Sequence, residues 1–86
     1  MKQTLADTIP LMQSADYQDR FRAEYEQLTI RAKKLEFMIG RYERNELDFT
    51  PKTPLPLLRA QFSSMATYLD VLDYRAEIEG INLNAS

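Results

Sequence analysis

The chain contains no cysteine and no histidine. Without cysteine it has no disulfide framework, no thiolate zinc site and no cysteine nucleophile. Without histidine it lacks the commonest general base, the commonest metal ligand and every catalytic pairing of histidine with serine or cysteine. We therefore expect a binding protein rather than an enzyme, with no catalytic residue, no metal and no cofactor.

Glycine is scarce, and the charges nearly balance. Two glycines and four prolines in 86 residues leave little material for the tight turns of an all-β fold. The net charge is −2, whereas domains that bind duplex nucleic acid are usually strongly basic. No apolar run has the length of a signal-peptide core or of a membrane span. We expect a cytoplasmic protein that binds neither duplex nucleic acid nor membrane.

Apolar residues recur in two stretches at alternating steps of three and four, which is the pattern of helices that press against each other. The pattern predicts an all-α fold with helices at about 15–45 and 54–79. Gly40 lies inside the first helix, where it permits a bend or, as we expect, the close approach of another backbone. The first seam comprises Phe21, Tyr25, Leu28, Ala32, Leu35, Ile39 and Tyr42, and the second comprises Leu55, Leu58, Phe62, Met65, Leu69, Leu72 and Ala76.

Residues that start and stop helices flank both stretches. Ser14 and Asp16 can each offer a side-chain oxygen to the free amides of the first helix. Asn45 can adopt the left-handed conformation that ends a helix, and Gly80 can do the same for the second helix. Thr53, which is followed by proline, is expected to cap the start of the second helix.

These elements predict one domain, an antiparallel two-helix hairpin over residues 1–86. It has an N-terminal arm (1–13), a connection (46–53) and a loose polar tail (82–86). The arm either packs on its own or a neighbouring subunit, or forms a lid over a ligand. Two helices bury one stripe each, and so small a chain is marginal by itself. We therefore expect a homo-oligomer, built on the apolar residues outside the seams: Phe37, Met38, Leu57, Tyr68, Val71, Tyr74 and Ile78.

A basic strip runs beside the first seam and consists of Arg20, Arg31, Lys34 and Arg41. Guanidinium and ammonium groups suit phosphate, although a strip of this kind can also be a solubilising face in which Arg20 pairs with a glutamate four residues later. Tyr17, at the start of the helix, can stack on a nucleobase beside these cations, or it can be the first residue of the core.

Two groups near the end of the second helix have two readings each. Arg75 stands among acidic residues and pairs with them, or copies of it converge on a symmetry axis as an anion pocket. Asp70, Asp73 and Glu77 follow steps of three and four, as in carboxylate sites for hard metals. With no further ligands from a partner helix, we expect them to form a solvated face.

Three segments resemble a family of small phage and prophage proteins with a helical hairpin, named after a crAss-like phage gene product. They read IPLMQSADYQDRFRAEYEQL (Ile9 to Leu28), LDFTP (Leu47 to Pro51) and LDYRAEIEGI (Leu72 to Ile81). More distantly, the chain is similar to the hairpin domain of anti-CBASS and anti-Thoeris sponges, hexamers that sequester cyclic oligonucleotides or messengers of the cyclic ADP-ribose type.

That resemblance implies a phage anti-defence protein that binds a cyclic nucleotide messenger without turnover. It assigns base stacking to Tyr17, phosphate binding to Arg31 with Arg20 and Lys34, and a separate pocket to Arg75. The alternative is a helical module that binds a protein or has a structural role in the phage, with no nucleotide ligand.

Overall fold

The computed structural model describes residues 4–84, and every regular element in this range is a helix. The predicted all-α class is therefore confirmed. Residues 1–3 of the predicted arm and 85–86 of the predicted tail lie outside the described residues. None of the described helices has the length and apolar character needed to cross a membrane. The elements are the 3-10 helix η1 (Ala6–Thr8), α1 (Ile9–Met12), α2 (Tyr17–Glu43) and α3 (Leu55–Glu79).

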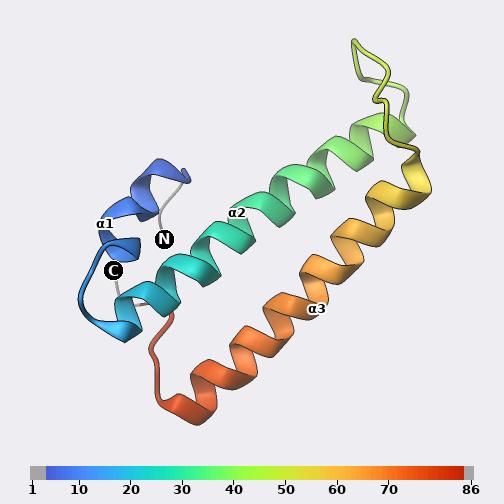
Figure 1. Cartoon of the computed structure of the whole chain (residues 1–86). Helices are drawn as coiled ribbons and strands as arrows, with labels where there is room; N and C mark the ends of the chain where they lie inside the picture. Colours follow the sequence, from blue (N-terminus) through green and yellow to red (C-terminus); the bar gives the residue numbers. More distant parts are fainter. Residues whose placement is uncertain (1–3, 85–86) are drawn as a thin grey trace.

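The two long helices lie alongside each other and run in opposite directions (Figure 1). Contacts at their two ends show the direction. Tyr17, at the start of α2, is hydrogen-bonded to Glu79 at the end of α3. Glu43, at the end of α2, forms an ion pair with Arg59 in the first turns of α3. The first turn of α2 and the last turn of α3 thus meet at one end of the molecule.

The seam residues predicted from the sequence are all buried or half-buried. A cluster of Phe21, Leu72, Ala76 and Ile81 forms the core at the end of the molecule where α2 begins and α3 ends. Tyr25 and Leu28 pack against this cluster. Burial of a large apolar side chain contributes about 1.5–3 kcal/mol, so this cluster is a main source of stability.

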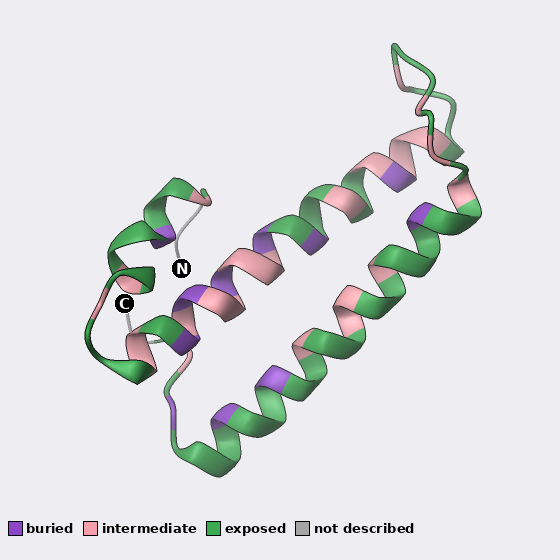
Figure 2. Ribbon diagram, in the orientation of Figure 1, coloured by how far each residue is buried: buried purple, intermediate pink, exposed green. Residues whose placement is uncertain are grey.

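The N-terminal arm covers a second face of α2 that sequence analysis did not identify. Ala23, Glu26 and Ile30 are buried there, and Thr8 of the arm is fully buried. The side-chain amide of Gln27 donates a hydrogen bond to the Thr8 hydroxyl at 2.9 Å. Figure 2 shows that buried residues are more numerous along α2 than along α3. In this structure, the arm packs on its own chain.

The N-terminal ends of the long helices are capped differently. At α2, Asp16 is the cap, and its carboxylate accepts a hydrogen bond from the Gln18 amide at 2.9 Å. At α3, the expectation of a Thr53 cap is wrong by one residue. Pro54 is itself the cap, because its carbonyl accepts the first helical hydrogen bonds and no side chain caps this end.

Both long helices end in the left-handed conformation predicted for Asn45 and Gly80, which have φ values of 59° and 69°. After Gly80 the chain turns back, and the Ile81 amide donates to the Ala76 carbonyl at 2.8 Å. This bond brings Ile81 into the core cluster. The segment expected to be a loose tail continues this contact, since Leu83 packs against the same cluster.

The second apolar face of α3 lies in solvent in the single chain. Its large side chains are 44–84% exposed, and Phe37 of α2 is 65% exposed. The exposed large apolar residues on α3 are Leu57, Tyr68, Val71, Tyr74 and Ile78.

We expected Gly40 to allow another backbone to approach, and this expectation is wrong within the chain. A Cβ atom there would meet only the flexible side chain of Arg44.

The two glycines predict opposite effects of alanine substitution. Gly80→Ala forces an alanine into the left-handed region and should lower the free energy of unfolding by about 1 kcal/mol. Gly40→Ala removes a weak helix former from the interior of α2 and should raise it by up to about 1 kcal/mol. Urea denaturation followed by circular dichroism measures both. Equal effects of the same sign would contradict the assignment of Gly80 as the cap.

Candidate functional site

Three side chains form a closed hydrogen-bonded triangle where α2 begins and α3 ends. The Tyr17 hydroxyl donates to Glu79 Oε1 at 2.8 Å, and Arg75 Nη2 donates to the Tyr17 hydroxyl oxygen at 3.0 Å. Arg75 Nε donates to Glu79 Oε2 at 3.2 Å, one turn away on the same helix. We refer to Tyr17, Arg75 and Glu79 as the terminal triad.

The terminal triad rests on the core through Phe21. The guanidinium carbon of Arg75 lies 5.2 Å from the centre of the Phe21 ring, within cation–π distance. The Tyr17 ring meets Phe21 edge-on with a centroid separation of 6.2 Å. Phe21 is only 3% exposed, whereas the Tyr17 side chain is about half exposed. A buried ring thus supports an arginine and a tyrosine whose outer faces reach solvent.

The triad also changes proton affinities. The hydrogen bond to Glu79 is the main cause that raises the pKa of Tyr17, and burial and the charge of Glu79 act in the same direction. Arg75 opposes this shift, because a nearby cation favours the phenolate. The hydrogen bond to Glu79 likewise raises the pKa of Arg75. At neutral pH the triad therefore holds a neutral tyrosine and a cationic arginine.

Two residues that sequence analysis assigned to different pockets therefore meet within one chain, namely Tyr17 and Arg75. Arg75 pairs with an acidic neighbour, which was one of its two predicted roles. Sequence analysis did not identify Glu79 and Phe21 as parts of a site. The signal was available, because an antiparallel pair brings the first turn of one helix to the last turn of the other.

The basic strip does not join this site in the single chain. Arg31 lies roughly 21 Å along α2 from Tyr17 at 1.5 Å per residue, and Lys34 lies farther away. Both are exposed and form no ion pair with any residue in 4–84. Arg20 is near Tyr17, but its guanidinium donates to the Ser14 carbonyl at 2.8 Å. Arg20 does not pair with Glu24, four residues later, because Glu24 instead accepts a hydrogen bond from Tyr68.

The acidic residues of α3 were considered from the sequence as a metal site or a solvated face. Asp70, Asp73 and Glu77 are exposed on α3. Within residues 4–84, no three acidic side chains are placed to hold a metal ion.

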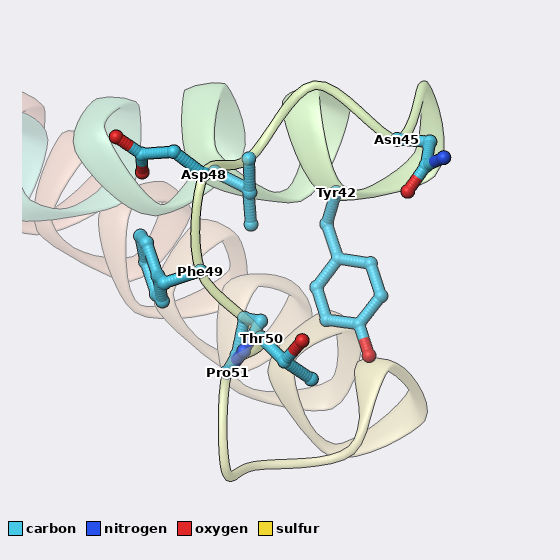
Figure 3. A pocket seen from close by; sticks show the side chains of 7 residues that line it. Tyr42, Asn45, Asp48, Phe49, Thr50 and Pro51 are labelled. Atoms are coloured by element: carbon cyan, nitrogen blue, oxygen red, sulfur yellow. The ribbon is translucent and has the colours of Figure 1, made fainter.

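A cavity of about 370 Å³ lies at the opposite end of the molecule, between the last turn of α2 and the connection (Figure 3). Tyr42, Leu47 and Pro51 are half-buried in its lining, and Phe49 is 57% exposed. This cavity is separate from the terminal triad, because the whole length of the long helices lies between them.

The terminal triad predicts a specific response of the Tyr17 hydroxyl to mutation. Glu79→Ala should lower the pKa of Tyr17 toward its ordinary value of 10.0, and Arg75→Ala should raise it further. In the wild type, the folded chain retains this proton above the ordinary pKa, where the unfolded chain loses it. The contribution to stability is therefore present below pH 10 and is lost as pH rises through the raised pKa.

NMR titration of ring-labelled tyrosine measures these shifts residue by residue. Tyr25 serves as an internal control, because burial is the main cause that raises its pKa and Glu79 is not among the causes. An unchanged Tyr17 pKa in the Glu79→Ala variant would contradict the triad.

Comparison with known families gives a match over most of the chain. The chain matches the Sequestin family over residues 15–78, a range that runs from the start of α2 to the last turn of α3. No curated protein and no solved structure matches the chain significantly. The phage origin implied by the sequence resemblance stays a prediction. Because the matched range includes most of the chain and both long helices, the protein belongs to the Sequestin family.

Proposed function

We propose that the protein sequesters a cyclic nucleotide messenger and does not hydrolyse it. The observation that carries this proposal is the juxtaposition of the half-exposed Tyr17 ring with the Arg75 guanidinium. A ring face for a base and a cation for a phosphate are the two elements that nucleotide binding needs. The family name, Sequestin, is consistent with a protein that retains its ligand. The absence of histidine and cysteine also favours binding over turnover.

The terminal triad supplies the orientation for such binding. Glu79 holds Arg75 through Nε, and Tyr17 holds it through Nη2. The guanidinium has five N–H donors, so the remaining ones are available to a phosphate oxygen. Stacking of a base on an aromatic ring contributes about 1–3 kcal/mol. Glu79 neutralises part of the positive charge, however, so tight binding of an anion requires additional cations.

Arg31 and Lys34 are the cations that we propose to complete the site, from a second copy of the chain. They are too far from Tyr17 to share a small ligand with it within one chain, and they have no ion-pair partner among residues 4–84. Arg20 contributes positive charge near Tyr17. Homo-oligomerisation, as in the hexameric sponges that the sequence resembles, therefore belongs to the proposed function.

The distribution of charge and apolar surface supports one arrangement of the proposed oligomer. The end of α3 carries exposed acidic residues beside the exposed Val71, Tyr74 and Ile78, whereas the middle of α2 is basic around Arg31 and Lys34. These surfaces are complementary, so we propose that α3 of one copy packs against α2 of another. This arrangement covers the apolar face of α3 and brings the basic strip toward the acidic end of the partner.

The proposed biological role is that of a phage protein acting in the cytoplasm of a bacterial host. There it would remove an immune messenger of the cyclic dinucleotide, cyclic trinucleotide or cyclic ADP-ribose type. The alternative is a helical interaction module without a nucleotide ligand. The exposed apolar face of α3 favours this alternative as well, because a helix of another protein would cover the same surface.

Calorimetric titration with cyclic dinucleotides, cyclic trinucleotides and cyclic ADP-ribose derivatives tests the ligand. We expect one class to bind and to be released intact on denaturation. Tyr17→Ala and Arg75→Ala should each weaken binding by roughly tenfold or more. Arg59→Ala is the matched control, because Arg59 is an exposed arginine of α3 that pairs with Glu43 at the opposite end. Failure of the whole panel, with tight capture of a host protein, would favour the interaction module.

Multi-angle light scattering tests the assembly. We expect a homo-oligomer, and Ile78→Glu should shift it toward monomer because this change places a charge in the proposed interface. Ile78 is 84% exposed in the single chain, so its replacement should leave the fold of the monomer intact. Asn84→Asp, at an exposed position beyond α3, controls for the added negative charge. A monomeric wild type at micromolar concentration would exclude the shared site.

A further inference from the structure

The cavity at the connection has the size and the lining of a second small-molecule site. Its volume of about 370 Å³ falls within the range of about 300–1,000 Å³ typical of ligand pockets. We propose that it binds an uncharged nitrogen heterocycle of nucleobase or nucleoside size. This site goes beyond the proposed function, because it shares no residue with the terminal triad.

The wall of the cavity suits a flat ring. Tyr42 projects from the last turn of α2 toward the part of the connection that carries Thr50 and Pro51 (Figure 3). Leu47 and Pro51 add half-buried apolar surface to the lining. A heterocycle placed against the Tyr42 ring would gain an offset-stacked contact and remove this apolar surface from water.

Several polar groups around the cavity have no hydrogen-bond partner among the described residues. Among residues 4–84, the side chains of Tyr42, Asn45 and Thr50 form no hydrogen bond with another residue. The backbone N–H groups from Leu47 to Thr50 likewise have no backbone partner in that range. The site therefore presents both donors and acceptors, which match the mixed hydrogen-bonding edges of a nucleobase and the hydroxyl groups of a ribose.

Charge selects against phosphate at this site. Asp48 is the only ionisable carboxylate or base that lines the cavity in the part of the chain described. The two nearest arginines in sequence are engaged with Glu46: Arg41 donates to its carbonyl at 2.9 Å, and Arg44 pairs with its carboxylate at 2.9 Å. An anionic ligand would meet the Asp48 carboxylate, and none of the described residues that line the cavity is a lysine or an arginine. A nucleoside should therefore bind better than its monophosphate, the reverse of the preference expected at the terminal triad.

NMR titration of the ¹⁵N-labelled full chain with adenosine, guanosine, cytidine and uridine tests the proposal. We expect saturable shifts of the Leu47 to Thr50 amides for at least one nucleoside. That nucleoside should bind at least about fivefold more tightly than its 5′-monophosphate, which corresponds to about 1 kcal/mol. No saturable shift of these amides at millimolar nucleoside would overturn the proposal, and so would equal or tighter binding of the monophosphate.

Three variants locate the site. Tyr42→Leu should weaken nucleoside binding by roughly tenfold, through the loss of the stacking ring. Asp48 is exposed and lies outside the seams, so Asp48→Asn should leave folding unaffected. It should abolish the preference for the nucleoside over its monophosphate. Tyr17→Ala should leave nucleoside binding unchanged, even where it abolishes cyclic nucleotide binding. The assignment of nucleoside binding to this cavity would be refuted if Asp48→Asn still preferred the nucleoside over its monophosphate. Loss of nucleoside binding in Tyr17→Ala would refute it as well.

Discussion

Each long helix of this protein has a second face beside its apolar seam, but a pair of helices can cover only one face of each. The α2–α3 contact buries the seams, which include Phe21 and Leu72. On α2, the N-terminal arm covers the second face, where Ile30 is buried. On α3, the second face stays in water, and Ile78 is 84% exposed. The proposed assembly follows from this imbalance, since exposed apolar area of this kind is normally an interface.

The same antiparallel pairing explains where the candidate site lies. It brings the first turn of α2 against the last turn of α3, so that Tyr17 meets Arg75 and Glu79. Both helix ends are anchored by the core cluster that contains Phe21, which restricts the positions of the arginine and the tyrosine. A site of this kind can bind and orient a ligand.

Much of the helical framework followed from local rules. The three-and-four periodicity located both seams, and the left-handed ends at Asn45 and Gly80 were expected from residue type alone. The expectations that failed rest on a single local signal each. Thr53 has a side chain suited to capping α3, but the helix begins one residue later and Pro54 is the cap. For Gly40, a glycine in a helix does not reveal whether another backbone is near, and here only the Arg44 side chain is.

Periodicity, capping residues and composition by themselves determined an all-α chain with two long helices, because these properties depend on neighbours three or four residues apart. Contacts between residues distant in sequence were decided only by the tertiary structure. The arm contributes Thr8 to a face of α2 that has no strong apolar period. Tyr17 and Arg75 are hydrogen-bonded to each other, although the sequence suggested two separate pockets. Their separation along the chain exceeds any local pattern. Only the packing of α3 against α2 brings them into hydrogen-bonding distance.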